Sequence, residues 1–459
     1  MTGHPPRVTV VGAGITGLAA AWELCTRGAA VTILEASSRL GGKLASREVA
    51  GVVVDTGPDA FLARGTAAVS LCEELGIELV APRVSSALVW TRGRLRPLPD
   101  GLVLGFPTKL WPLMHSGIVS LPGMVRAGLD LVIPTTRLGE DFSVAEAVTP
   151  RLGREVTARL VEPLLGGIHA GTAAGLSLPE VAPTVAAAVS RSRSAIRALR
   201  TLPTPPTRAT SNSHAASPTA GRPPVFLTPR GGLHLLASRL VEELVERGVE
   251  IRTRAPVRSL TSLGDDPLVL ALPAHAAAPL VAALDRNLGS ELFAIHHASV
   301  VVVTLAYPAG SLPDSLPGTG FLSPRQEGRL MTATTWLSTK WDHCRPSDLC
   351  LARVSVGRID DTRHREFGDH DLAVRAHDEL AEAMSTIHLQ LPPPLATAVN
   401  RWSLALPQYG VGHRARVERI ERAAVDLPGL HLAGNYLHGV GVPACIESGR
   451  AAARAAAGG

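Results

Sequence analysis

Aromatic and lysine residues are scarce in this sequence of 459 amino acids. Aromatic side chains make up 3% of the chain, which leaves few stacking platforms for nucleic-acid bases. The positive charges are nearly all arginines, and the net charge of +5 is spread along the chain without a compact basic run, so we expect no nucleic-acid partner. Arginine side chains suit carboxylates and phosphates, which indicates an anionic small molecule as the ligand.

Cysteines are few and scattered. The five cysteines contain no CxxC pair, which argues against a disulfide framework and a metal site and favours a reducing, cytoplasmic location. No apolar run is long and uninterrupted enough to predict a transmembrane segment. The N-terminus shows no basic region followed by a cleavable apolar segment. The sequence leaves the oligomeric state open.

A glycine-rich turn lies near the N-terminus, between a predicted strand at 8–11 and a predicted helix at 18–27. In a GxGxxG turn the first glycine permits the bend, the second admits a pyrophosphate, and the third lets helix and strand pack closely. Glu35 follows the next predicted strand, at a position where a carboxylate binds ribose hydroxyls. The sequence therefore predicts a dinucleotide site built on Gly12, Ala13, Gly14, Ile15, Thr16 and Gly17.

The residues that follow Glu35 favour FAD over NAD. Residues 36–43, ASSRLGGK, resemble the FAD-binding continuation of the amine oxidase superfamily, and residues 55–60, DTGPDA, resemble its segment beside the isoalloxazine ring. A plain dehydrogenase needs neither segment. The residues that this resemblance places at the cofactor are Ala36, Arg39, Gly42, Lys43, Gly57, Pro58, Asp59 and Ala60.

A second glycine-rich turn lies near the C-terminus, where a predicted strand at 430–433 is followed by a turn and a closing helix. The N-terminus of such a helix can place positive charge against the pyrimidine ring of a reduced flavin. This segment resembles the closing FAD motif of the same superfamily. The expected flavin contacts are Gly434, Asn435, Val440, Gly441 and Val442.

Further segments resemble the protoporphyrinogen/coproporphyrinogen oxidase family of haem synthesis, most closely its soluble, coproporphyrin-forming branch from Gram-positive bacteria. The most telling is EPLLGGIHAG, which amine oxidases and phytoene desaturases lack. The resemblance covers nearly the whole chain apart from 201–224, and it adds Val257 as an adenine contact and Trp402 as a flavin contact. The segments that carry it are GPDA at 57–60, EPLLGGIHAG at 162–171, FLTPRGGL at 226–233, PQY at 407–409 and GNY with GVGVP at 434–443.

This resemblance implies an FAD enzyme that oxidises coproporphyrinogen III to coproporphyrin III, with oxygen as acceptor and hydrogen peroxide as product. Protoporphyrinogen IX is the alternative substrate; another flavin amine oxidase or desaturase and a non-enzymatic FAD-binding protein are the remaining alternatives. No catalytic residue is assigned. The candidates for proton handling are Tyr409, His413 and His169, and the candidates for binding substrate carboxylates are Arg64, Arg94, Arg96 and Arg230.

The predicted fold is α/β: a discontinuous Rossmann-like FAD-binding domain with an inserted α+β substrate domain and a helical lobe. The length fits about two or three domains, and both chain ends are expected at one cofactor. The apolar segment 101–134 is expected to line the lobe and a ligand wall, with contact to a membrane surface as the alternative. The predicted parts are the FAD-binding domain at 1–97, 225–295 and 398–459, the lobe at 98–200, a flexible loop at 201–224 and the substrate sheet at 296–397.

Overall fold

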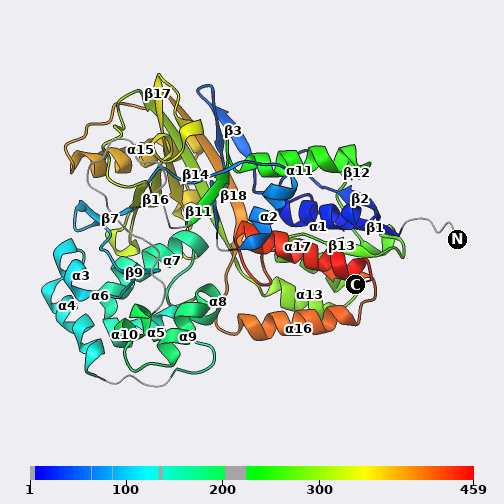
Figure 1. Cartoon of the computed structure of the whole chain (residues 1–459), viewed down its shortest axis with the longest axis horizontal. Helices are drawn as coiled ribbons and strands as arrows, with labels where there is room; N and C mark the ends of the chain where they lie inside the picture. The colour runs from blue at the N-terminus through cyan, green and yellow to red at the C-terminus, as the bar shows by residue number, and fades with distance from the viewer. Residues whose placement is uncertain (1–5, 64, 85, 134–137, 202–223, 459) are drawn as a thin grey trace.

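Two large β-sheets and a lobe of helices make up the structure (Figure 1). The computed structural model describes residues 6–63, 65–84, 86–133, 138–201 and 224–458. The predicted loop at 201–224 therefore lies almost wholly outside the described residues, and so does Arg64.

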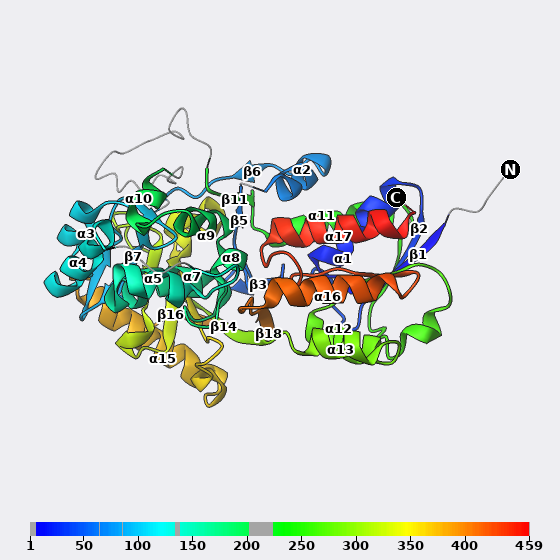
Figure 2. The same cartoon turned by 90° about the horizontal axis from the view of Figure 1, so that it is seen from below.

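The first sheet is parallel and combines three distant parts of the chain. Its strand order is β12-β2-β1-β13-β19, and each neighbouring pair is parallel. Helices α1, α11 and α17 cover one face, and α12, α13 and α16 cover the other (Figure 2). The strands are β1 (Arg7–Val11), β2 (Ala30–Leu34), β12 (Glu250–Arg252), β13 (Leu268–Leu270) and β19 (Leu430–Leu432). The helices are α1 (Ile15–Thr26), α11 (His234–Glu246), α12 (Ala274–Ala282), α13 (Arg286–Phe293), α16 (His413–Val425) and α17 (Val442–Ala456).

The second sheet has the strand order β18-β14-β17-β16-β15-β7-β8, and helix α15 (Asp369–Ser385) packs on one of its faces. Every pairing is antiparallel except that of β15 with β7. Residues 88–97 and 398–407 belong to the ranges predicted for the FAD-binding domain, but the structure pairs them in this second sheet. The sequence could not predict this, because strand pairing depends on register between segments that are far apart in the chain. The strands are β7 (Leu88–Thr91), β8 (Arg94–Pro97), β14 (His297–Pro308), β15 (Gly320–Leu322), β16 (Met331–Trp336), β17 (Leu349–Val356) and β18 (Ala396–Pro407).

Three small sheets complete the strand pairing of the described residues. One is a hairpin beside the second sheet, one joins the segment after residue 60 to the segment after residue 224, and one lies in the helical lobe. Their strands are β3 (Ser46–Val49) with β4 (Val52–Asp55), β11 (Phe226–Pro229) with β5 (Phe61–Leu62) and β6 (Leu79–Val80), and β9 (Leu102–Val103) with β10 (Phe106–Pro107).

The helical lobe has its own core of buried leucine, valine and alanine side chains. Residues 154–169 are helical throughout, as α6 (Arg154–Val156), a π-helical segment at Thr157–Val161 and α7 (Glu162–His169). The other lobe helices are α3 (Leu110–Ser116), α4 (Leu121–Gly128), α5 (Val144–Leu152), α8 (Leu178–Val181), α9 (Pro183–Ser190) and α10 (Ala195–Arg200).

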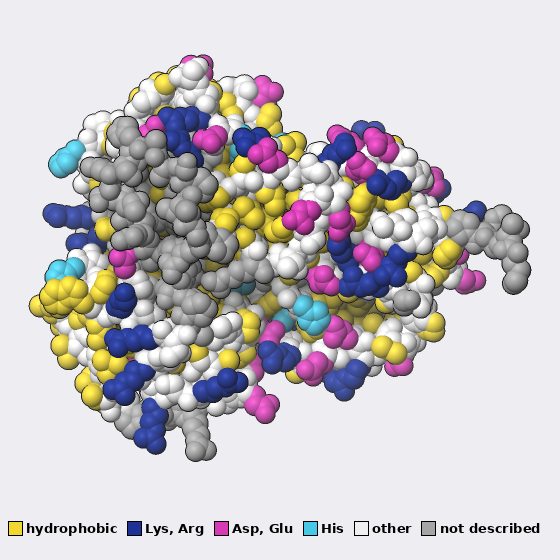
Figure 3. Space-filling view, viewed as in Figure 1, with side chains coloured by type: hydrophobic (Ala, Val, Ile, Leu, Met, Phe, Trp, Pro, Cys, Tyr) yellow, Lys and Arg dark blue, Asp and Glu magenta, His cyan; other side chains and the backbone are white. Residues whose placement is uncertain are grey.

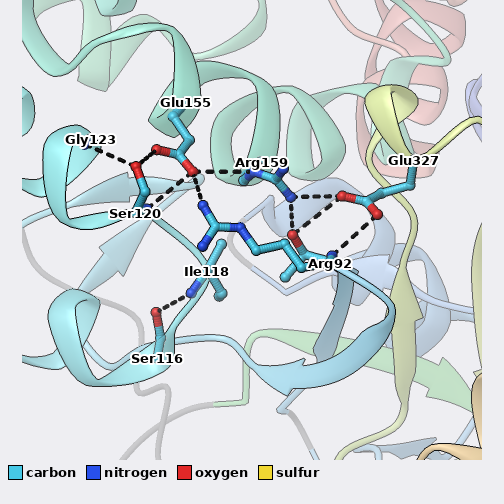
Figure 4. A network of polar contacts seen from close by, with 9 residues as sticks. Arg92, Ser116, Ile118, Ser120, Gly123, Glu155, Arg159 and Glu327 are labelled. Carbon is cyan, nitrogen blue, oxygen red and sulfur yellow. Dashed lines mark hydrogen bonds and ion pairs between the residues drawn. The ribbon is translucent and has the colours of Figure 1, made fainter.

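A network of charged side chains ties the lobe to the second sheet (Figure 4). Arg159, in the π-helical segment, donates to Glu327 at 2.7 Å and also pairs with Glu155. Glu155 accepts a hydrogen bond from Ser120 at 2.6 Å and pairs with Arg92, which lies between β7 and β8. Because several partly buried charges share partners, this network fixes the lobe against the sheet better than isolated surface pairs would.

Helices α1 and α17 meet backbone to backbone over the first sheet. A Cβ atom at Gly449 would lie 2.1 Å from the carbonyl oxygen of Thr16 and 3.2 Å from the nitrogen of Ala20. Only glycine permits this approach, so the C-terminal helix is held directly against the helix that follows the glycine-rich turn.

We expect Gly449→Val to force α1 and α17 apart and to destabilise the protein by about 1–3 kcal/mol, the usual cost of overpacking. The unfolding midpoint in urea, followed by circular dichroism, measures this effect. Ala451→Val is the matched control, because it adds valine at an exposed position of the same helix. Equal midpoints for the two variants would show that the helices do not need this contact.

Candidate active site

The three glycines of the N-terminal turn differ in the space around them. A Cβ atom at Gly12, whose φ is +101°, would lie 2.6 Å from the carbonyl oxygen of Ala271, and one at Gly17 would lie 1.9 Å from that of Gly12. At Gly14 a Cβ atom would meet nothing within 4 Å. Gly12 and Gly17 therefore serve the packing of the turn, whereas Gly14 borders open space at the start of α1.

The start of α1 provides unpaired donors next to this space. Gly14 is the N-cap residue and supplies no capping side chain, so N–H groups of the first turn are directed outward. The Lys43 side chain has no hydrogen-bond or ion-pair partner among the described residues, and burial lowers its pKa. Two sources of positive charge beside an open space fit a pyrophosphate group.

The segment containing Lys43 is fixed to the turn by its two glycines. Gly41 donates its N–H to the carbonyl oxygen of Ala13 at 2.8 Å, and a Cβ atom at Gly42 would lie 2.9 Å from the Cα of Gly14. The Arg39 guanidinium donates to the carbonyl oxygen of Gly42 at 2.8 Å. Arg39, predicted at the cofactor, is thus engaged in holding this loop.

Glu35 connects β2 to the turn. Its carboxylate accepts hydrogen bonds from the backbone N–H groups of Ala13 and Ser37, both at 2.8 Å. The segment before Val257 lies beside it, because Ala255 donates its N–H to the Glu35 carbonyl oxygen at 2.9 Å. The structure therefore brings Glu35 and the Val257 segment together at the same end of the sheet, while the neighbouring Ala36 is exposed.

The starts of helices α1 and α17 do not lie side by side. Because β1 and β19 lie in one parallel sheet, the helices that follow them run in the same direction. Gly449 lies beside Thr16, so α17 extends seven residues, or about 10 Å, beyond this contact toward its N-terminus. Gly441, the N-cap of α17, supplies no capping side chain. The N-termini of α1 and α17 are thus offset along the molecule, and each can bind a negatively charged part of an extended dinucleotide.

Tyr409 and His413 brace the closing turn. The Tyr409 hydroxyl donates to the Asn435 carbonyl oxygen at 2.5 Å and accepts the Gly439 N–H at 2.8 Å. The two rings stack with centroids 4.0 Å apart, and burial raises the pKa of Tyr409. These two candidates for proton handling are therefore engaged in holding the turn.

His169 occupies a different position, at the end of α7. Its side chain is 6% exposed, its Nδ1 atom has no partner among the described residues, and burial lowers its pKa to about 4. The Gln408 amide donates to the His169 carbonyl oxygen at 2.8 Å. The segments 162–171 and 407–409, which are far apart in sequence, therefore meet.

Asp59 and Lys340 form a pair that the sequence analysis missed. Lys340 Nζ and Trp341 Nε1 donate to Asp59 Oδ2 at 2.7 and 3.0 Å, and Lys340 helps to hold the pKa of Asp59 well below its usual range, against the effect of burial. Lys340 ends the short helix α14 (Leu337–Lys340). Its rarity, as one of three lysines, was the signal available in the sequence.

A cavity of about 130 Å³ opens beside this pair. It lies between the segment that follows β4 and the second sheet. Its lining residues are Asp59, Ala60, Pro82, Val84, Phe226, Thr319 and Lys340.

The arginines considered for the substrate carboxylates are not in the lining of this cavity, as far as the described residues show. Arg230 forms an exposed pair with Glu78, Arg94 is exposed on β8, and Arg96 donates to the Ser116 carbonyl oxygen at 3.5 Å. None of these three lines the cavity beside Asp59. The fourth, Arg64, lies outside the described residues.

Trp402 joins the second sheet to the cofactor segment. Its indole N–H donates to the carbonyl oxygen of Thr56 at 2.7 Å, directly before the GPDA residues 57–60. The Arg39 guanidinium lies 5.7 Å from the centre of the Trp402 ring. The predicted flavin contacts from β18 and from the first part of the chain are thus adjacent.

The apolar segment 101–134 has two contrasting faces. One face contributes to the core of the lobe. The other exposes Trp111, Leu121 and Val125, at 70%, 73% and 68%, and Figure 3 shows hydrophobic side chains at this edge of the molecule. In the described part of the chain, no helix has the length and apolarity that a membrane span requires.

Comparisons with known proteins identify the family. The model of the family described as flavin containing amine oxidoreductase matches residues 15–457. This chain belongs to that family. The match confirms the prediction of a flavin cofactor, FAD, and of an oxidoreductase.

Several proteins are similar to this one over nearly the whole chain. A Bacillus subtilis protein named coproporphyrinogen III oxidase is 33% identical over 98% of both chains. A protein of the same name from Mycobacterium tuberculosis (strain H37Rv) is also 33% identical, over 97% of this chain and 96% of its own. A solved structure from Exiguobacterium sp. 255-15, provisionally named a protoporphyrinogen oxidase, superposes with a TM-score of 0.85 at 29% identity over 98% of both chains.

We expect Gly14→Val to give folded protein without flavin. A Cβ atom at this position meets no protein atom within 4 Å, so the new side chain extends into the space beside the unpaired donors. Flavin absorbance per mole of purified protein measures the loss. Gly368→Val is the matched control, since Gly368 is also a helix N-cap with negative φ and open surroundings. Full flavin content in Gly14→Val would refute a cofactor path past Gly14.

Three buried histidines predict a loss of stability in acid. Burial lowers the pKa of His169, His297 and His413 to about 4, whereas an unfolded chain protonates histidine near about 6.5. Their contribution to the free energy of unfolding is present above about pH 6.5 and is lost as the pH falls toward 4, on the order of 1 kcal/mol per histidine for each pH unit.

Melting temperatures measured between pH 7.5 and 4.5 test this dependence. His413→Asn is expected to flatten the acid slope, and His370→Asn, at an exposed position near the start of α15, is the control. An identical slope in all three proteins would contradict the assignment of buried, neutral histidines.

Proposed function

We propose that this protein is an FAD-dependent coproporphyrinogen III oxidase that uses oxygen and produces coproporphyrin III and hydrogen peroxide. The observation that carries the proposal is the 33% identity to the Bacillus subtilis coproporphyrinogen III oxidase over 98% of both chains. The five free cysteines suit a reducing environment, so we place the enzyme in the cytoplasm.

The flavin site is assigned to the two helix N-termini and the segments between them. Gly14, the first turn of α1 and Lys43 hold the pyrophosphate, and Glu35 accepts hydrogen bonds from the ribose with its remaining lone pairs. The start of α17 stabilises negative charge on the flavin ring. When bound, FAD supplies the acceptor for the hydride and passes its electrons to oxygen.

The substrate is assigned to the side of the flavin bordered by Asp59 and Lys340. Asp59 belongs to the segment predicted to run beside the flavin ring, and Lys340 ends helix α14, which follows strand β16 of the second sheet. Their hydrogen bond therefore connects the predicted flavin segment to the second sheet, beside the cavity. Holding the ring in a reactive orientation is the main task left to the protein, since the flavin performs the oxidation.

Protoporphyrinogen IX is the alternative substrate. A tobacco protein named protoporphyrinogen oxidase, chloroplastic, is 26% identical over 95% of this chain. Coproporphyrinogen carries four propionates and protoporphyrinogen two, and the predominance of arginine among the positive charges favours the former. The similarity to a cyclohexylamine oxidase, at 17% identity and a TM-score of 0.67, concerns the fold alone.

The proposal is tested by offering the two porphyrinogens, prepared anaerobically, to the aerobic enzyme. We expect porphyrin fluorescence to rise faster with coproporphyrinogen III, with hydrogen peroxide formed in step. The flavin-free Gly14→Val protein controls for spontaneous oxidation. Fluorescence that rises no faster than in this control with either substrate would overturn the proposal, and a clear preference for protoporphyrinogen IX would support the alternative.

A further inference from the structure

Part of one face of the second sheet carries polar side chains beside an apolar cluster that includes Ala306, Leu351 and Ala398. The register places Thr304 opposite Arg353, and Arg353 opposite Thr335, so these three side chains share one face. Ser355 and Asn400 lie in the next row of the same face, through their pairing with Val302. We call these five residues the polar face.

The opposite side of the sheet is an ordinary core. Val301, Val303 and Val354 alternate with the residues of the polar face and pack with Leu380 of α15. The other side has a smaller apolar cluster around Ala306, Leu351 and Ala398, and the residues of the polar face are not members of it.

The polar face contains atoms that the protein leaves without partners. Thr304 Oγ1 and Asn400 Nδ2 are buried and have no hydrogen bond among the described residues. The half-buried Arg353 guanidinium likewise has no hydrogen-bond or ion-pair partner there. Buried polar atoms are normally paired, so several unpaired atoms on one face indicate a surface that meets a ligand.

The position of the polar face agrees with this interpretation. Arg353 is near enough for its charge to lower the pKa of Asp59, which lines the cavity. At the other end, a Cβ atom at Gly167 of α7 would lie 3.6 Å from the side chain of Leu322, which shares a row with Ser355. The polar face therefore extends from the Asp59–Lys340 pair to helix α7.

The charges in this region do not balance. Lys340 already has a carboxylate partner, because Asp59 accepts its hydrogen bond at 2.7 Å. Arg353 is a second cation beside the same carboxylate and forms no ion pair of its own among the described residues. A half-buried guanidinium gains most from a ligand carboxylate, which it can bind through two parallel hydrogen bonds.

We propose that Arg353 binds a propionate carboxylate of the tetrapyrrole substrate, with Lys340 kept out of this contact by Asp59. This inference rests on the proposed function and names the residue that recognises the substrate's charge. Arg353 is thus a specificity-determining residue, and the unpaired Thr304 and Asn400 side chains provide further polar contacts on the same face.

The test is an equilibrium titration of the FAD-bound protein with coproporphyrin III, followed by porphyrin fluorescence. The second probe is its tetra-amide, which keeps the ring and the side-chain length but carries no carboxylate. We expect wild-type protein to bind the acid at least about tenfold more tightly than the amide. Arg353→Gln should weaken binding of the acid by about ten- to hundredfold, the value of one or two charge-assisted hydrogen bonds, and leave the amide unchanged.

Two further variants separate the carboxylate contact from general effects. Arg353→Lys keeps the charge without the planar fork and should recover only part of the lost affinity. Arg239→Gln removes one exposed positive charge on α11 and should leave both Kd values unchanged. Flavin absorbance, measured on each sample, shows whether the cofactor site is intact.

The inference is overturned if wild-type protein binds the acid and the amide equally, a result that depends on no variant. It is also overturned if Arg353→Gln retains the wild-type Kd for the acid. Porphyrinogen oxidation by the same wild-type preparation separates these outcomes from a failure of the proposed function, because oxidation would persist while the charge preference was absent.

Discussion

The contact between Gly449 and Thr16 determines much of this architecture. It brings the helix that ends the chain to within backbone distance of the helix that follows the first glycine-rich turn. Because both helices follow strands of one parallel sheet, they run in the same direction, and the start of one lies beyond the start of the other. Two sites for negative charge are thereby held at a fixed separation by elements from opposite ends of the chain.

The segment around residues 56–59 connects the first part of the chain to the second sheet. Trp402 on β18 and Lys340 at the end of α14 form hydrogen bonds to residues 56 and 59, so the same short segment contacts both parts of the molecule. Tyr409 holds the closing turn in place through two backbone groups. In the function proposed above, the polar face of the second sheet lies on the side where the substrate would meet the cofactor, and the substrate would supply partners for its unpaired atoms.

The sequence predicted the features that depend on local backbone space. Gly12 and Gly17 mark a turn whose geometry requires glycine, Gly14 borders open space, and the segment at 41–43 packs against this turn. Lys340 and Arg353 were missed because their significance depends on strand register and on which residues lie opposite. Tyr409 was noticed as a titratable group, but its two hydrogen bonds to backbone groups became visible only in the structure. Arg230 was considered for substrate binding, yet its partner is Glu78, 152 residues away in sequence.

Hydrogen–deuterium exchange, compared between apo-protein and protein reconstituted with FAD, tests most directly whether both chain ends form one cofactor site. The account predicts that binding slows exchange both at residues 12–17 and at residues 439–445, with the same FAD concentration dependence. Protection of only one of these segments, or protection at clearly different concentrations, would contradict it.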